Sequence, residues 1–159
     1  MLPLQLLALI VIANGTPILL RRLLGYRFRL AVDGGICFFD HRRLFGPRKT
    51  LVGVLGAIFT STAAASLLGL GWEIGLQVGL FAMLGDLFSS FLKRRLNLAP
   101  SGKAPGLDQL PESLLPALAV REALRLSWWE LTAVVTAFFL FGALVSPLLH
   151  RLRIRDQPY

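Results

Sequence analysis

The chain has 159 residues, of which 55% are hydrophobic and 16% are charged, and its mean hydropathy is +0.64. Soluble domains carry about 25% charged residues, so this composition excludes an ordinary water-soluble globule, and it excludes a disordered chain as well. Lys and Arg number 17 against 9 Asp and Glu, which gives a formal net charge of +8. A hydrophobic chain with few and mostly basic charges is typical of an integral membrane protein.

Apolar segments follow one another along the chain at lengths that suit membrane-spanning helices. We predict an all-α integral membrane protein with a single transmembrane domain over residues 1–159. The fourth segment is short and contains Arg121 and Glu122, which we expect to form a neighbouring pair inside that helix and to face protein rather than lipid. The predicted helices cover about residues 2–20, 50–70, 72–92, 110–126 and 128–149, with long loops at 21–49 and 93–109.

The first segment differs from a secretory signal, in which basic residues precede the apolar stretch. Here residues 1–20 carry no charge, and Arg21 and Arg22 follow them. We therefore expect a retained helix whose N-terminus lies outside the cell.

Basic residues then set the predicted topology, because they are enriched on the cytoplasmic side of a membrane. Segment 21–49 holds eight of them, segment 93–103 holds four, and the tail from residue 151 holds three. These three regions fall on one side only if the fourth segment crosses. We accordingly predict about five transmembrane helices in the cell membrane, with the N-terminus outside, the C-terminus cytoplasmic and both long loops cytoplasmic.

One face of the third segment carries polar side chains. Asp86, Ser90 and Lys93 follow helical spacing, and Gly75 and Gly79 lie on the same face. A stripe of small residues permits close approach of another helix, and packing alone accounts for the two glycines. An unpaired carboxylate at membrane depth is costly, so Asp86 is interpreted as functional.

The first long loop combines acids, glycines and many cations. Asp33 precedes two glycines, Arg43 lies further along, and Lys49 and Thr50 stand at the start of the second segment. A helix N-terminus and cations favour phosphate, although the residues around Lys49 do not match a Walker phosphate loop. A basic loop attracted to acidic lipids is the alternative explanation.

The second long loop contains Asp108, which precedes the fourth segment and is either its N-cap or a metal ligand. The single Cys37 and two distant histidines exclude a Cys/His metal site. Carboxylates, cations and a buried polar face together suit transfer between a nucleotide and a lipid phosphate. Magnesium takes carboxylate and phosphate oxygens and would neutralise the charge that develops on the phosphates.

The sequence resembles the CDP-archaeol synthases, a family related to the CTP:phosphatidate cytidylyltransferases. The resemblance covers roughly residues 10–112 and rests on ordered blocks. These blocks are residues 13–17, 33–35, 40–50, 85–95 and 106–110.

The resemblance implies an enzyme that transfers a cytidylyl group from CTP to a lipid phosphate, releasing a CDP-lipid and pyrophosphate, with Mg²⁺ as cofactor. It implies catalytic roles for Asp86, Lys93 and Asp108, with Asp86 and Asp108 holding the metal. It further implies a substrate-binding set, which comprises Asn14 and Pro17 at a lipid groove and Asp33, Arg43, Lys49, Thr50, Ser90 and Arg94 around the nucleotide and phosphates.

Two alternatives stay open from the residues alone, namely a small membrane transporter and a non-catalytic adaptor that binds acidic lipids. The lipid tail is also open, since isoprenoid ether and acyl ester phosphates both fit. No nucleic-acid partner is expected, and a homo-oligomer is one alternative for the assembly.

Overall fold

Five helices make up the chain in the computed structural model, which describes residues 1–25, 30–98 and 106–151, with side chains up to residue 144. Arg27, Arg29, Lys103 and the basic tail, which entered the predicted topology, lie outside the described side chains. The helices are α1 (Leu2–Leu24), α2 (Leu51–Leu67), α3 (Trp72–Arg95), α4 (Gln109–Val120) and α5 (Trp128–Arg151).

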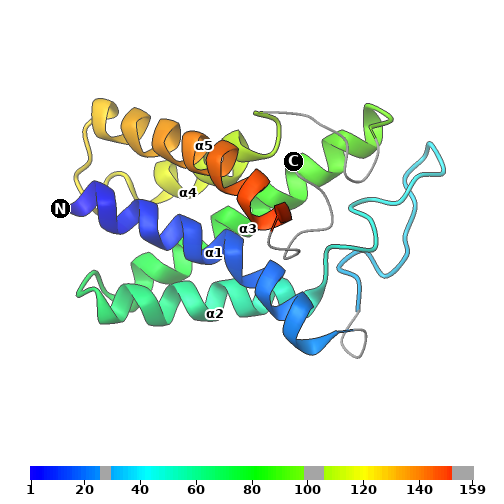
Figure 1. Ribbon diagram of the computed structural model, residues 1–159, viewed down its shortest axis with the longest axis horizontal. Coiled ribbons are helices and arrows are strands. Elements are labelled where there is room, and N and C mark those ends of the chain that lie inside the picture. The colour runs from blue at the N-terminus through cyan, green and yellow to red at the C-terminus, as the bar shows by residue number, and fades with distance from the viewer. Residues whose placement is uncertain (26–29, 99–105, 152–159) are drawn as a thin grey trace.

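The helices run alternately up and down, so each lies antiparallel to the next along the chain (Figure 1). The N-terminus and the turns at 68–71 and 121–127 lie at one end of the bundle. The described parts of the two long loops lie at the other end, together with the last turn of α5. This arrangement brings the basic loop segments to the same end, as the charge distribution predicts.

Local signals account for several helix boundaries. The Thr50 hydroxyl accepts a hydrogen bond from the Gly53 N–H at 3.2 Å and caps the start of α2. Before α5, the Ser127 hydroxyl accepts from the Glu130 N–H while the Glu130 carboxylate accepts from the Ser127 N–H, which is a capping box. Gly71 has a positive φ of 89° in the short turn between α2 and α3.

Glycines on α3 permit its close packing against α2, as the small-residue stripe predicts. A Cβ built on Gly75 would lie 2.4 Å from the Ser61 carbonyl oxygen. A Cβ built on Gly79 would lie 2.2 Å from the Ser61 hydroxyl. Neither position has room for a side chain, so the two backbones are in direct contact.

The fourth helix is shorter than the predicted span of 110–126. It has 12 residues and ends at Val120, so Arg121 and Glu122 lie in the following turn and not inside a helix. The apolar pattern runs past the helix because Leu124 and Leu126 fold back into the core, where they are 8% and 3% exposed. The Arg121 guanidinium stacks 4.0 Å from the Trp128 ring centre, which replaces the expected pairing inside the helix.

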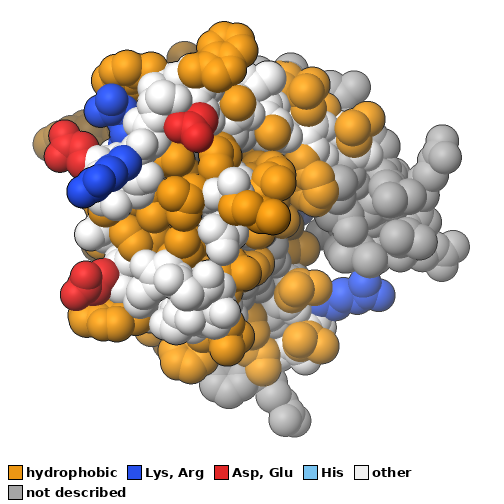
Figure 2. Space-filling view, turned by 90° about the vertical axis from the view of Figure 1, so that its left-hand side faces the viewer, with side chains coloured by type: hydrophobic (Ala, Val, Ile, Leu, Met, Phe, Trp, Pro, Cys, Tyr) orange, Lys and Arg blue, Asp and Glu red, His pale blue; other side chains and the backbone are white. Residues whose placement is uncertain are grey.

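The helix surface is apolar on many sides. Within the described residues, α1 and α3 are long and apolar enough to cross a membrane, whereas the apolar stretches of α2 and α5 are shorter. Phe59 on α2 and Leu144 on α5 are about three-quarters exposed. Figure 2 views the end that carries the N-terminus, where hydrophobic side chains dominate and charged ones are scattered. The exposed apolar side chains along the sides of the helices are suited to lipid.

Candidate functional site

Two lysine–carboxylate ion pairs connect the long loops to α3. Lys49, just before α2, pairs with Asp86 in the second half of α3. Lys93, two turns further along α3, pairs with Asp108, which directly precedes α4. The two pairs also interact with each other, because the Asp108 charge acts on Lys49 and the Lys93 charge acts on Asp86. The structure thus brings together the three predicted catalytic residues and the predicted substrate-binding residue Lys49 in one cluster.

A fifth charged side chain, Glu112, belongs to this cluster and was missed in the sequence. Its charge acts on both Asp86 and Lys49, and its backbone lies against Gly85, the residue before Asp86. Glu112 lies four residues after Asp108, so both acids occupy one face of the start of α4. This spacing was the available signal, but it gained meaning only once α4 was placed against α3.

The position of α4 depends on Gly85, the residue before Asp86. A Cβ built on Gly85 would lie 2.2 Å from the Pro111 carbonyl oxygen and 2.8 Å from the Glu112 backbone nitrogen. The backbones of α3 and α4 therefore touch beside the ion-pair cluster. The start of α4 therefore lies beside the second half of α3, and Asp108, directly before it, reaches Lys93 in the last turn of α3.

The acids of the cluster keep Lys49 in its charged form. Burial alone would lower the pKa of the Lys49 ammonium, but the Asp86 carboxylate and the acids at the start of α4 outweigh it and raise that pKa. Lys49 is therefore a cation at neutral pH.

No three Asp, Glu, His or Cys side chains of the described residues converge closely enough to hold a metal ion by themselves. Asp86 and Asp108 are each engaged by a lysine instead.

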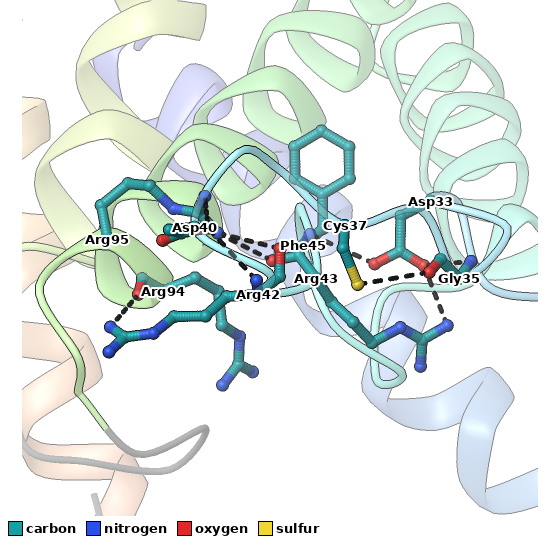
Figure 3. Close-up of polar contacts among 9 residues, drawn as sticks. All are labelled: Asp33, Gly35, Cys37, Asp40, Arg42, Arg43, Phe45, Arg94 and Arg95. Carbon is teal, nitrogen blue, oxygen red and sulfur yellow. Dashed lines mark hydrogen bonds and ion pairs between the residues drawn. The ribbon is translucent and has the colours of Figure 1, made fainter.

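Asp33 organises the first long loop (Figure 3). Its carboxylate accepts hydrogen bonds from the backbone N–H groups of Gly35, Phe45 and Gly46 at 3.0, 3.2 and 2.8 Å. The Arg43 guanidinium donates to the same carboxylate at 3.1 Å. The side chain has no exposed surface. The structure thus places Asp33 inside the loop, where it fixes the conformation that carries the basic residues.

The contacts of Asp33 favour its ionised form. Burial on its own would raise the pKa of this carboxyl group, but three backbone N–H donors and the Arg43 guanidinium outweigh burial. The pKa of Asp33 therefore lies below its usual value. The loop depends on a carboxylate that stays charged at any physiological pH.

Arg95, at the end of α3, holds the loop against the bundle and was not singled out in the sequence. Its guanidinium pairs with Asp40 and donates to the backbone carbonyls of Arg42 and Arg43 at 3.3 and 3.1 Å. It also lies 4.9 Å from the ring centre of Phe38. The several N–H donors of this guanidinium fix both the distance and the orientation of the loop relative to the end of α3.

A basic cavity of about 340 Å³ lies between this loop and the end of α3. Arg42, Arg43, Arg94 and Gly46 line it. Gly46 has a φ of 94°, and a Cβ there would lie 2.7 Å from an Arg94 guanidinium nitrogen. The Nε atoms of Arg43 and Arg94 are buried without a hydrogen-bond partner. Guanidinium donors that lack an acceptor are suited to an anionic ligand such as a phosphate.

A second cavity, of about 250 Å³, lies between the end of α1 and the start of α2. Leu20 and Val52 give it apolar walls, while Arg21 and Arg48 supply positive charge. Pro47 lines both cavities, so the segment before Lys49 separates them. One cavity is thus strongly basic, and the other combines cations with an apolar wall at the helix ends.

The remaining predicted residues occupy structural positions. Ser90 is buried on α3 with 9% exposure, and Thr50 is the α2 cap. Asn14 donates to the Ile10 carbonyl within α1, and Pro17 packs against Gly53. Neither Asn14 nor Pro17 lines one of the two cavities, so their part in a lipid groove stays a prediction.

Comparison with known proteins places this arrangement in context. A family model for CarS-like CDP-archaeol synthases matches residues 6–159. The CDP-archaeol synthase of Sulfurisphaera tokodaii is 34% identical, over 93% of this chain and 84% of its own length. That of Pyrobaculum islandicum is 32% identical, over 93% and 92%. A solved structure described as an intramembrane enzyme for archaeal membrane lipid biosynthesis superimposes with a TM-score of 0.73 at 32% identity, over 89% of this chain and 90% of that one.

Proposed function

The chain belongs to the CDP-archaeol synthase family and is an intramembrane, CTP-dependent cytidylyltransferase that acts on a lipid phosphate, and we propose that its active site is the ion-pair cluster between α3, α4 and the first loop. The observation that carries this proposal is the meeting of the Lys49–Asp86 and Lys93–Asp108 pairs. Charges of both signs are concentrated there, beside the basic cavity and at the inner ends of apolar helices.

The carboxylates of the cluster fit a magnesium ion. Asp86 and Asp108 offer only oxygen donors, and Mg²⁺ is usually held by one or two carboxylates together with substrate phosphates. A protein group of three ligands is therefore not required. When bound, the ion would neutralise negative charge on the triphosphate as the bond to the leaving pyrophosphate breaks.

The two lysines are the proposed ligands of the substrate phosphates. Lys49 and Lys93 each neutralise a carboxylate in the structure, and we propose that they contact phosphate oxygens once the nucleotide and its cation are present. A lipid phosphate oxygen attacks the α-phosphorus of CTP, one new P–O bond forms, and the bond to the β-phosphate oxygen breaks. The protein contributes position and positive charge, and no protein nucleophile is needed.

The basic cavity is the proposed place for the outer phosphates of CTP. Its arginines, Arg43 and Arg94, present buried N–H groups that lack acceptors, which a phosphate would supply. The cavity with apolar walls on the other side of Pro47 is the proposed entry for the lipid phosphate. The two substrates would then approach Lys49 from opposite sides of one loop segment.

The names of the relatives support archaeol phosphate, an isoprenoid ether lipid, as the natural acceptor. We further propose five crossings of the cell membrane, with the N-terminus outside and the active site facing the cytoplasm, where CTP is available. The alternating helix directions and the basic character of the loop end support this orientation.

One assay tests the proposed site. Purified protein is incubated with labelled CTP, Mg²⁺ and a panel of ether and ester lipid phosphates, and the CDP-lipid is quantified. Asp86→Asn and Asp108→Asn should each lower the rate by about 10²-fold or more, because each removes a metal-binding and lysine-orienting charge. Glu73→Gln, an exposed acid at the opposite end of α3, is the control and should leave the rate unchanged. Full activity in Asp86→Asn would refute the site.

A further inference from the structure

The turn between α4 and α5 holds an arginine that the proposed reaction does not use. Arg121 directly follows α4, at the end of the bundle opposite the ion-pair cluster (Figure 1). Its guanidinium carbon lies 4.0 Å from the ring centre of Trp128, the first residue of α5. Its Nε atom is buried and has no hydrogen-bond partner among the described residues. The aromatic ring thus holds a cation in place while part of its donor set is unsatisfied.

Neighbouring acids do not supply the missing acceptor. The Glu130 carboxylate accepts hydrogen bonds from the Ser127 backbone N–H and hydroxyl at 2.9 and 2.8 Å, so it is engaged in the cap of α5. Glu122 is exposed, and no ion pair joins it to Arg121 in the described part of the chain. A guanidinium that stacks on a ring keeps its N–H groups in its own plane, where an anion from outside the chain can accept them.

The turn fixes the backbone of Arg121 against the bundle. The Arg121 carbonyl accepts a hydrogen bond from the Leu126 N–H at 2.9 Å, and the Leu124 N–H donates to the Val120 carbonyl at 2.9 Å. The side chains of Val120, Leu124 and Leu126 are all buried in the core. The guanidinium is therefore carried by a packed turn and not by a loose surface loop.

The surroundings of Arg121 indicate which anion it meets. The chain has three tryptophans and all lie at this end, because Trp72 begins α3 while Trp128 and Trp129 begin α5. Their side chains are 57%, 62% and 81% exposed. Tryptophan is enriched where a membrane meets water, at the level of the lipid headgroups. Figure 2 shows this end as mainly hydrophobic with few charged side chains, which suits a lipid better than a soluble anion.

We propose that Arg121, oriented by Trp128, binds the headgroup phosphate of a membrane lipid in the leaflet opposite the active site. The guanidinium donates N–H groups to the phosphate oxygens, as arginine commonly does to phosphate. The inference rests on the proposed membrane crossing and goes beyond the proposed reaction. A purely structural role is the alternative, in which Arg121 only stabilises the C-terminal end of α4 through the helix dipole.

The tryptophans provide the measurement. Because all three lie at this end, quenching of their fluorescence by a brominated lipid reports lipid contact there and not at the active site. Purified protein in a maltoside detergent, which contains no phosphate, is titrated with brominated phosphatidylglycerol in the absence of CTP. Brominated diacylglycerol, which has the same chains and no phosphate, is the comparison lipid and should bind at least several-fold more weakly.

Variants at Arg121 separate the two roles. Arg121→Met keeps the length of the side chain and removes its donors, so the phosphatidylglycerol fraction that gives half-maximal quenching should rise by about tenfold. Arg121→Lys keeps the charge and should retain part of the affinity. Arg125→Met, which removes an exposed cation of the same turn, is the matched control and should change the affinity little. Each titration is normalised to the unquenched fluorescence of that variant, and folding is checked by gel filtration.

Equal affinity of wild type and Arg121→Met for brominated phosphatidylglycerol would overturn the inference, and a lowered Tm with unchanged affinity would assign Arg121 the structural role. Inorganic phosphate at millimolar concentration should not displace the lipid. Displacement would assign the site to a soluble anion and would also overturn the inference. The proposed active site and the proposed crossing have separate tests, in the activity of Asp86→Asn and in labelling of the two ends. Their failure is therefore distinguishable from failure of this site.

Discussion

Lys49 and Asp86 form an ion pair that joins the residue preceding the α2 N-cap to the second half of α3. The pair is mostly enclosed, with 27% and 15% of the two side chains exposed. Lys49 also anchors the base of the first loop, because its carbonyl accepts a hydrogen bond from the Val32 N–H at 2.8 Å. Lys49 thus joins the loop that carries the arginines to the helix that carries the acid, in addition to the contacts that Arg95 makes.

Removal of the Lys49 charge should therefore impair catalysis severely. Lys49→Met keeps the length and the apolar stem but leaves Asp86 without its cation, and it removes a proposed phosphate ligand. We expect the rate of CDP-lipid formation to fall by about 10²–10³-fold. The control is Arg125→Met, an exposed cation at the opposite end of the bundle, which should retain activity. A rate for Lys49→Met within a few-fold of wild type would assign this lysine to the membrane surface alone.

The contact between Gly85 and α4 gives a second prediction. Gly85→Ala places a methyl group against the Pro111 carbonyl, so α4 must shift and carry Asp108 and Glu112 with it. We expect a loss of about 1–3 kcal/mol of stability, the usual cost of overpacking, and at least a tenfold loss of rate. Gly15→Ala is the matched control, because no atom lies within 4 Å of a Cβ at that helical glycine. Equal behaviour of the two variants would contradict tight α3–α4 packing.

Much of the fold could be predicted from the sequence, because apolar segments and basic loops follow simple physical rules. Five helices and the close packing at Gly75 and Gly79 are visible as periodicity, whereas the Lys49–Asp86 and Lys93–Asp108 ion pairs were not predicted. The end of α4 could not be predicted from the sequence, because Leu124 and Leu126 are buried in the turn that follows the helix and continue its apolar pattern.

The site was predictable only in part, for a different reason. Asp86 stands out because carboxylates are rare in apolar segments. Asp108 lies in a loop, where its position before the fourth segment fitted either an N-cap or a metal ligand. Arg95 carries no local signal, and Glu112 has only its four-residue spacing from Asp108, since the positions of both depend on which helix or loop lies opposite them. Asp33 was predicted beside the nucleotide, whereas the structure uses its carboxylate to organise the loop backbone. The family assignment, in turn, decides for an enzyme over a transporter or an adaptor.

Arg95 should affect nucleotide affinity more than the chemical step. Arg95→Lys keeps the charge but loses the fork that binds two loop carbonyls, so Arg42 and Arg43 are held less firmly. We expect the KM for CTP to rise by about tenfold, with kcat reduced by less. Asp40→Asn leaves both carbonyl contacts intact and should have the milder effect. Steady-state kinetics with varied CTP measure both, and a loss confined to kcat would contradict a positioning role.

The lowered pKa of Asp33 predicts how stability depends on pH. Because the folded-state pKa lies below that of the unfolded chain, this carboxylate stabilises the fold fully above an unfolded pKa of about 4. That stabilisation is lost as the pH falls through the lower folded-state value. The Tm difference between wild type and Asp33→Asn should thus be constant from pH 7 to 5 and shrink toward pH 3. A difference that stays constant down to pH 3 would show that the Asp33 charge is not involved.

The proposed orientation can be tested with the single cysteine of the chain. Cys37 is exposed on the first loop, at the same end of the bundle as the basic segments. A membrane-impermeant maleimide should label it in inside-out vesicles but not in sealed right-side-out cells. The reciprocal probe is Ala123→Cys in a Cys37→Ser background, since Ala123 is exposed in the turn at the opposite end. It should be labelled only from outside, and labelling of both cysteines from one side would contradict an end-to-end crossing of the membrane.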